Sequence, residues 1–133
     1  MKRSDTYTLG RAGNLLVLRA AVTGRGGKTV VLRLLVDTGA SCTMIPMEAA
    51  ERVGCDTHHP LRTLRIVAAN GVIVAPVVKL ARFSCLGVAL TGFQVVAHTL
   101  PSGTYVDGLL GMDFLRSVGA VLDIRRATVQ VDG

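Results

Sequence analysis

The sequence predicts a single, mainly β domain, and three observations lead to that fold class. The chain has 133 residues, close to the rough prior of about 150 residues per domain and too few for two. Half of the residues are hydrophobic and mean hydropathy is +0.47, which excludes a disordered chain. Short apolar runs alternate with turn residues, among them 15 glycines. This texture is typical of a β-barrel or β-sandwich.

The first half of the chain predicts two strands and a short helix. Residues 15–22 form an apolar run, and the glycine-rich residues 23–28 form a turn. Residues 29–36 are almost entirely aliphatic, so we expect a strand that is buried on both faces. Residues 46–53 have helical composition, and Gly54 follows as a stop signal.

The second half predicts mostly hairpins. Residues 64–68 and 72–80 flank Ala69-Asn70-Gly71, and Asn-Gly between β-rich runs is the strongest short hairpin signal. Residues 86–90 and 93–97 predict a further strand pair around Thr91-Gly92. The remaining expected elements are a strand at 106–110, a short helix at 112–117, and a closing hairpin of 121–124 and 128–131.

The charge balance is basic but diffuse. Fifteen Lys and Arg against nine Asp and Glu give a formal charge of +6 and a pI of about 9.9. The densest basic groups are only Lys2-Arg3, residues 25–28 and Arg125-Arg126, and few aromatic residues could stack on bases. We therefore expect no nucleic-acid partner. A general preference for acidic partners, or plain solubility, is the simpler interpretation.

Cysteine usage and hydropathy predict the compartment. Cys42, Cys55 and Cys85 are odd in number, which excludes a complete disulfide framework. Polar residues 1–5 are followed by no apolar h-region, and no window approaches 18 uninterrupted apolar residues. We expect a cytoplasmic protein without a membrane segment, unless an upstream anchor or signal has been removed.

Two segments resemble familiar binding motifs but lack residues that those motifs require. Residues 24–29 resemble a phosphate-binding loop, but Val22 stands where that pattern needs glycine, and a β-rich run follows in place of a helix. The Cys, Asp and two His of residues 55–59 lie on one short loop, with no second ligand pair at zinc spacing. We therefore expect a structural loop there, and neither a metal nor a cofactor.

One motif carries chemistry. In residues 34–41, an aliphatic run delivers Asp37 into a sharp turn with Thr38 and Gly39. Burying a lone charge costs on the order of several kcal/mol, so neighbours or a partner must satisfy this acid. Thr38 offers a hydroxyl with a stiff χ1, and Gly39 permits a close backbone approach. These residues fit a catalytic carboxylate on a rigid platform and equally an ordinary Asx turn.

A resemblance to a known family favours the catalytic interpretation. Residues 35–41 resemble the active-site loop of retropepsin-like aspartic proteases. Leu109-Leu110-Gly111, preceded by Asp107-Gly108 and followed by the expected helix, is similar to the second signature of that family. The Ala69-Asn70-Gly71 turn lies midway, where the family carries its flap hairpin. The resemblance covers residues 15–131 approximately, and is greatest to small bacterial members and to the protease domain of ubiquitin-shuttle proteins.

The resemblance implies a closed β-barrel of the retropepsin type with a flap hairpin and one or two short helices, as one domain over residues 1–133. It also implies roles for individual residues. Asp37 would be catalytic, with Thr38 and Gly39 supporting its loop, and the substrate would contact Ala40, Ser41, Ala69, Asn70, Gly71 and Leu109. Ser41 departs from the retroviral pattern, which has a second acid there, and this leaves the subsite preferences open.

The expected reaction is peptide-bond hydrolysis in extended polypeptides. It needs two facing carboxylates, and like charges about 3 Å apart share one proton because both cannot ionise. The chain holds one Asp-Thr-Gly, so the resemblance implies a C₂ homodimer with one Asp37 from each copy. Aliphatic residues near Leu109, Ile73 and Val74 would form apolar subsites. We expect Asp113 and Asp123 to be surface or capping acids.

Two alternatives remain open. The chain could be a non-catalytic, protease-like dimeric module that binds peptides or acts as a scaffold. It could also be a basic, nucleic-acid-binding β-barrel. Turnover of a mixed peptide library separates the first alternative from a protease. Strongly salt-dependent DNA or RNA affinity would indicate the second.

Overall fold

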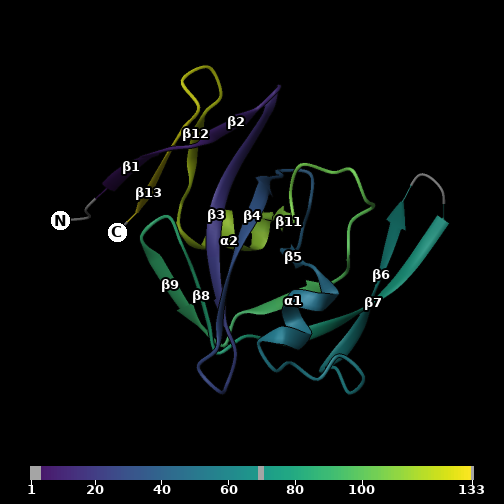
Figure 1. Cartoon of the computed structure of the whole chain (residues 1–133). Helices are drawn as coiled ribbons and strands as arrows, with labels where there is room; N and C mark the ends of the chain where they lie inside the picture. The colour runs from purple at the N-terminus through teal and green to yellow at the C-terminus, as the bar shows by residue number, and fades with distance from the viewer. Residues whose placement is uncertain (1–3, 69–70, 133) are drawn as a thin grey trace.

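The computed structural model describes residues 4–68 and 71–132, and it confirms a mainly β fold built around a curled sheet (Figure 1). The large sheet runs in the order β6-β7-β10-β5-β11-β4-β3-β8-β9, with β2 pairing to β3, and the other sheet in the order β1-β13-β12. The sheet curls without closing completely, since β6 and β9 end the path. The strands are β1 Ser4–Thr8, β2 Gly10–Ala12, β3 Leu15–Thr23, β4 Thr29–Val36, β5 Met44–Ile45, β6 Arg62–Ala68, β7 Gly71–Lys79, β8 Arg82–Cys85, β9 Val88–Thr91, β10 Gln94–Ala97, β11 Gly108–Leu110, β12 Val121–Asp123 and β13 Thr128–Asp132.

Strand β4 lies near the middle of the large sheet and leads to Asp37. It pairs antiparallel with β3 on one side and parallel with β11 on the other. The expectation that β4 is buried on both faces is wrong. Leu32 and Leu34 are buried, whereas Arg33 is exposed and Val31 is 62% exposed. Only one face of the sheet covers the core here, so successive side chains alternate between core and solvent.

The core joins the sheet to the second helix. All three phenylalanines of the chain meet there, with ring centroids 5.0 Å apart for Phe83 and Phe93 and 5.4 Å apart for Phe83 and Phe114. The two predicted helices are present as α1 (Met47–Arg52) and α2 (Met112–Ser117). Each has only six residues, too few to be stable alone, so each depends on its buried residues for stability.

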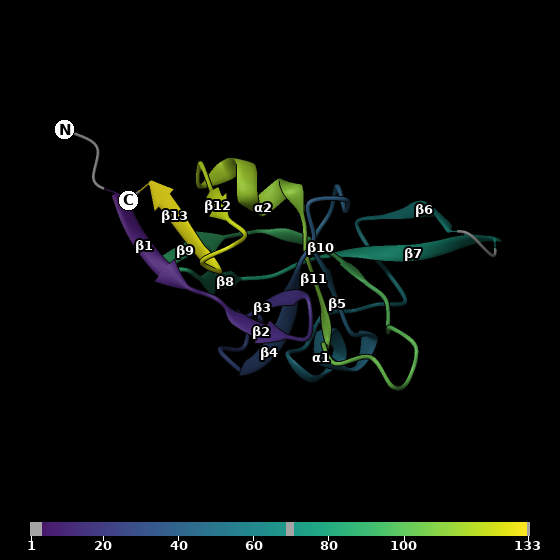
Figure 2. The same cartoon turned by 90° about the horizontal axis from the view of Figure 1, so that it is seen from above.

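The predicted flap hairpin is confirmed as β6 and β7. The two strands pair antiparallel from Arg62 opposite Val77 to Ala68 opposite Gly71. Its turn residues Ala69 and Asn70 lie outside the described residues. In both views the hairpin projects from the body of the molecule at the end opposite the two termini (Figures 1 and 2). Among the described residues, its strand pairing to the body is at its base, where β7 pairs with β10.

The hairpin predicted at 86–90 and 93–97 is wrong. The chain instead forms β8 and β9 around Leu86-Gly87, and β10 pairs with β7 and β5. Leu86 and Gly87 both have positive φ, 52° and 71°, which suits the tight hairpin turns that match strand twist. Leucine rarely adopts that conformation, so its turn was not recognisable from composition.

The three-stranded sheet joins the two ends of the chain. The predicted closing hairpin is present as β12 and β13, and β1 adds to it by pairing antiparallel with β13. The sequence did not predict β1, because the alternating residues of Ser4–Thr8 are mostly polar. Among the described residues, no helix has the length and apolar character needed to cross a membrane.

Candidate active site

Asp37 is the first residue after β4, and a backbone hydrogen bond holds it in place. Its N–H donates to the carbonyl of Leu110 at 3.0 Å, which extends the β4–β11 ladder by one residue. The carboxylate folds back over its own loop, where Oδ1 accepts the N–H of Gly39 at 2.9 Å. Among the described residues, Oδ2 has no hydrogen-bond donor. The half-buried carboxylate is therefore held through one oxygen while the other is unengaged.

A second carboxylate, Asp113, locks the segment that follows the loop. Its Oδ2 accepts the backbone N–H of Thr43 at 2.9 Å, and its Oδ1 accepts the Thr43 hydroxyl at 2.7 Å. The same Oδ1 accepts the N–H of Phe114 at 2.8 Å, in the first turn of α2. We expected a surface or capping acid. The N-cap of α2 is Gly111, without a side-chain cap, and Asp113 instead binds Thr43, which is fully buried and 70 residues away in sequence.

Gly111 allows the start of α2 to pack closely against the segment that follows the Asp37 loop. A Cβ atom on this residue would lie 2.6 Å from the carbonyl carbon of Cys42, closer than real side chains approach. Its N–H donates to the Thr43 hydroxyl at 3.1 Å. Just beyond it, Met112 N–H donates to the carbonyl of Ala40 at 2.8 Å. The start of α2 therefore lies directly against the Asp37 loop.

Of the other predicted substrate-binding residues, Leu109 packs in a cluster with flap residues. Ala40 and Leu109 are half-buried and Ser41 is exposed. Leu109 belongs to a hydrophobic cluster that also contains Cys42 on the loop and Leu64 and Ile66 on the flap. The cleft-side contacts of the flap thus come from Leu64 and Ile66. Gly71 begins β7, while Ala69 and Asn70 are outside the described residues.

One predicted subsite residue is on the wrong face of the flap. Ile73 pairs with Ile66, so it shares the face of the hairpin that packs toward Leu109. Val74 pairs with Arg65 on the opposite face and is 61% exposed. The prediction treated two adjacent strand residues as equivalent, although their side chains point to opposite faces.

Thr38 lies at the outer rim of the loop. Its side chain is exposed at the edge of a shallow groove of about 210 Å³, together with Met112, Leu115 and Leu122. Among the described residues, its hydroxyl has no hydrogen-bond partner. A second molecule placed against this rim would meet a free hydroxyl beside apolar side chains.

The remaining titratable groups singled out from the sequence are structural. Asp123 accepts the N–H of Arg126 at 3.0 Å in the β12–β13 turn, as expected of a capping acid. Asp56 accepts the N–H groups of His58 and His59, together with a contact to the His59 ring at 2.9 Å. The hydrogen bond from His59, reinforced by those backbone N–H groups, lowers the pKa of the Asp56 carboxyl.

The free thiols differ in burial. Burial raises the pKa of Cys85 to about 12, and it raises the pKa of Cys55 as well. Cys85 is buried and therefore lacks the accessible surroundings of a nucleophile. Cys42 is half-buried next to the Asp37 loop, and its Sγ lies 3.8 Å from the Ser41 hydroxyl.

Comparison with known families decides the relationship. The family model described as aspartyl protease matches residues 20–114, a span that includes both the Asp37 loop and the Gly111 segment. The chain belongs to the aspartyl protease family. No curated protein matches this aspartyl protease family member.

Solved structures show which fold this family member has. A retropepsin-like aspartic protease from Rickettsia conorii superposes with a TM-score of 0.71 at 21% identity, over 99% of this chain and 93% of the other. The EIAV protease, solved with the inhibitor HBY-793, superposes with a TM-score of 0.57 at 17% identity, over 80% of this chain and 90% of the other. The aspartyl protease family member therefore has a retropepsin-like fold.

Proposed function

We propose that the chain is an aspartic endopeptidase that works as a C₂ homodimer, with Asp37 of each copy forming one shared site. The observation that carries the proposal is the state of the Asp37 carboxylate. Its loop is rigidly fixed by Leu110, Gly39 and the Gly111 segment, yet Oδ2 has no donor among the described residues. By contrast, Asp113 in the first turn of α2 engages both of its oxygens.

Charge repulsion supplies the chemistry. Two Asp37 carboxylates brought about 3 Å apart could not both ionise, so the pair would hold one proton. The ionised carboxylate takes a proton from a water molecule as that water attacks the scissile carbonyl carbon. The protonated carboxyl donates a hydrogen bond to the carbonyl oxygen and later supplies the proton for the leaving nitrogen. The proton belongs to the pair and not to either residue.

The surface around Thr38 supports the shared site. Its hydroxyl is free among the described residues and lies at the rim of the apolar groove beside α2. A second copy related by a two-fold axis would present the same hydroxyl and the same groove, which is the requirement for an isologous interface. Each Thr38 would bind the loop of the partner and hold the two Asp37 side chains in register.

An extended polypeptide would lie between the flap and the floor of each half. Backbone hydrogen bonds to the flap and the Asp37 loop would give affinity, as when a strand joins a sheet. We propose that Ala40, Ser41 and the flap turn, residues 69–71, contact the substrate backbone. The apolar cluster of Leu109 and Ile66 would receive its side chains, which favours aliphatic or aromatic residues near the scissile bond.

Replacement of Asp37 by asparagine tests the chemistry. The isosteric Asp37→Asn chain should fold normally and lose about 10³-fold or more of its peptidase activity, because an amide cannot act as the base. Cleavage by the unmodified chain should be blocked by a statine-type mimic of the tetrahedral intermediate. Unchanged cleavage in Asp37→Asn would remove Asp37 from the mechanism.

Mixing the two chains tests the shared site. In an equal mixture that has exchanged subunits, activity per unmodified chain should fall to about half, since half of those chains then sit in dimers with one Asp37. A site built from one chain alone would keep its full activity. Should neither chain cleave any member of a mixed peptide library while both still dimerise, the non-catalytic peptide-binding module would be the better description.

A further inference from the structure

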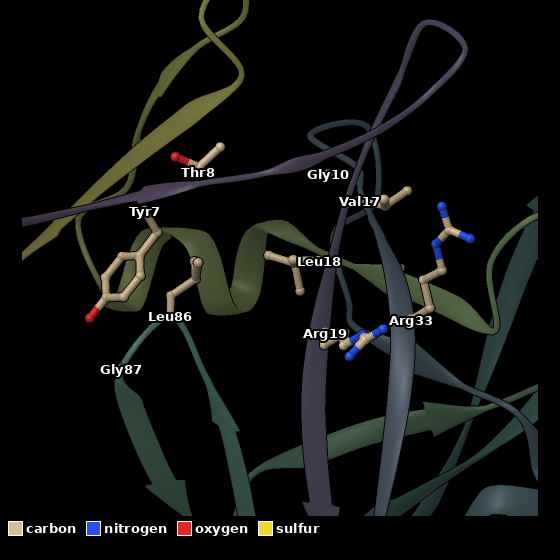
Figure 3. Close-up of a pocket in the computed structure, with 9 residues that line it drawn as sticks. All are labelled: Tyr7, Thr8, Gly10, Val17, Leu18, Arg19, Arg33, Leu86 and Gly87. Carbon is tan, nitrogen blue, oxygen red and sulfur yellow. The ribbon is translucent and has the colours of Figure 1, made fainter.

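A sizeable cavity lies away from Asp37. It is lined by residues of β1, β2, β3, β4 and the β8–β9 turn and has a volume of about 620 Å³. We call it the Arg19–Arg33 groove, and its main lining residues are Tyr7, Leu18, Arg19, Arg33, Leu86 and Gly87. Figure 3 shows Tyr7 and Leu86 at one end, Leu18 in the middle, and the two arginines at the other end. It has the size of a binding site for a small ligand or a few residues of a chain.

The two arginines occupy an electrostatically unfavourable position. Arg19 and Arg33 are directly opposite each other in the antiparallel β3–β4 ladder, and both are exposed. Side chains so placed have Cβ atoms about 5 Å apart, and like charges there destabilise the sheet. Among the described residues, neither guanidinium has a carboxylate within salt-bridge distance. Asp107 contacts this region, but its Oδ2 accepts the backbone N–H of Arg33 and not the guanidinium.

The strand edge beside the arginines is also open. On that edge of β3, β2 pairs with residues 15–17 and β8 pairs with residues 21–23. Leu18, Arg19 and Ala20 lie between, with no strand partner on that edge among the described residues. Backbone hydrogen-bonding groups there remain available to an incoming chain.

The end of the groove away from the two arginines is lined by apolar side chains. Leu18 and Leu86 are half-buried against the main core, and Tyr7 packs across the Gly87 turn. A Cβ on Gly87 would collide with the Tyr7 hydroxyl, so glycine is needed for this close contact as well as for the turn. The groove thus combines an apolar floor with open backbone groups and two guanidinium groups that have no carboxylate partner in the part of the chain that the structure describes.

We propose that the Arg19–Arg33 groove binds an acidic segment of a polypeptide, one carboxylate between the two guanidinium groups and a neighbouring apolar side chain on Leu18, Leu86 and Tyr7. Arginine suits this role because its planar fork binds carboxylates in a bidentate manner. The net charge of +6 adds a general attraction for acidic partners.

The position of the groove connects it to the proposed protease. Arg33 on β4 precedes Asp37, the first residue after that strand, by four residues, a separation of about 13 Å in an extended chain. A polypeptide held in the groove could therefore continue to the cleft within a few residues. This connection rests on the proposed function, whereas binding of the acidic segment does not.

Binding is tested with the full-length Asp37→Asn chain, in which cleavage cannot interfere. The probes are two short fluorescein-labelled peptides with the central sequences Leu–Glu–Leu and Leu–Gln–Leu. We expect the glutamate peptide to bind about tenfold more tightly by fluorescence anisotropy, with an advantage that shrinks at high salt. The double replacement Arg19→Glu with Arg33→Glu should remove the difference.

A matched control separates the groove from net charge. Lys28→Glu with Arg82→Glu changes the charge equally at two exposed positions outside the groove and should keep the tenfold preference. Equal binding of the two peptides, or equal loss in both double variants, would overturn the proposal. The proposal would also be overturned if both peptides bound independently of Arg19 and Arg33 and decanoate displaced them. That result would indicate a pocket for small carboxylates.

Cleavage supplies the second readout. In the unmodified chain, a cleavable peptide with glutamate a few residues from the scissile bond should show a higher kcat/KM than its glutamine partner, and only the Arg19/Arg33 double variant should lose the preference. Arginine-dependent binding without any cleavage would refute the proposed protease and leave the groove intact. Cleavage with no such binding would refute the groove and leave the protease intact.

Discussion

The floor of the candidate active site and the flap above it are built in different ways. The floor is cross-linked by side chains and backbone between two segments that are distant in sequence, Asp37 to Thr43 and Leu110 to Phe114. The flap is a two-stranded hairpin with a ladder of its own, tied to the body mainly at its base through β10. Isolated hairpins are marginally stable, so we expect the flap to be more mobile than the floor.

Removal of Asp113 should break the floor and have the largest effect. Asp113→Ala leaves the N–H groups of Thr43 and Phe114 and the buried Thr43 hydroxyl without their acceptor. We expect a loss of about 3 kcal/mol in the free energy of unfolding, measured by urea denaturation at a fixed chain concentration. Peptidase activity should fall as well, since the Asp37 loop loses its support.

Asp37→Asn is the matched control for that experiment. Its carboxylate accepts one backbone N–H and lies at the surface of the loop, so unfolding should change by less than about 0.5 kcal/mol. The two variants would then show different roles for the two acids. Asp113 would be essential for stability, and Asp37 would be needed for turnover alone. An Asp113→Ala chain as stable as the unmodified protein would show that the floor is not cross-linked in this way.

Two adjacent flap residues test which face of the hairpin serves the cleft. Ile66 packs toward Leu109, whereas Val67 is 82% exposed on the other face. Ile66→Ala should cost about 1.5 kcal/mol and raise KM for peptides, while Val67→Ala should change neither stability nor KM appreciably. Steady-state kinetics and thermal melts of both variants provide the comparison. Equal effects on KM would mean that the faces are assigned incorrectly.

The labelling rates of the cysteines test the contrast between a rigid body and a mobile flap. Cys85 is buried in the body and its pKa is raised to about 12, so at pH 8 only about one thiol in ten thousand is ionised. It should react with a disulfide reagent only on unfolding. Cys42 lies at the seam between floor and flap and should react in the folded protein, faster in Ile66→Ala. Mass spectrometry identifies the labelled site, and rapid labelling of Cys85 would contradict a rigid body.

The smallest effect is expected at Asp56. Like Asp113 it accepts three contacts, but its group is fully exposed, and its pKa is lowered from 3.8 chiefly by the hydrogen bond with His59. A lowered pKa in the folded state means that this carboxylate stabilises the fold above pH 3.8 and that the contribution disappears as pH falls below that value. A carboxyl ¹³C titration should show the low pKa, and His59→Ala should return it toward 3.8.

Individual residues show why prediction succeeded at some places and failed at others. The flap hairpin was predictable because Asn-Gly encodes its turn in adjacent residues. The β8–β9 hairpin was not, because its turn places Leu86 at a positive φ and Thr91-Gly92 offered a competing signal. The Asp37 loop was predictable from seven consecutive residues, whereas nothing near Asp113 indicates its contact with Thr43.

The sequence by itself determined the elements whose information is local, namely the strand that delivers Asp37, the two short helices, the flap and the closing hairpin. Neighbouring residues carry that information through backbone preference and side-chain alternation. Only the tertiary structure decided that β10 joins β7 and β5, that Asp113 supports Thr43 across 70 residues, and that Arg19 and Arg33 face each other beside an open strand edge. Those arrangements depend on how distant segments pack together, and no short stretch of the chain specifies them.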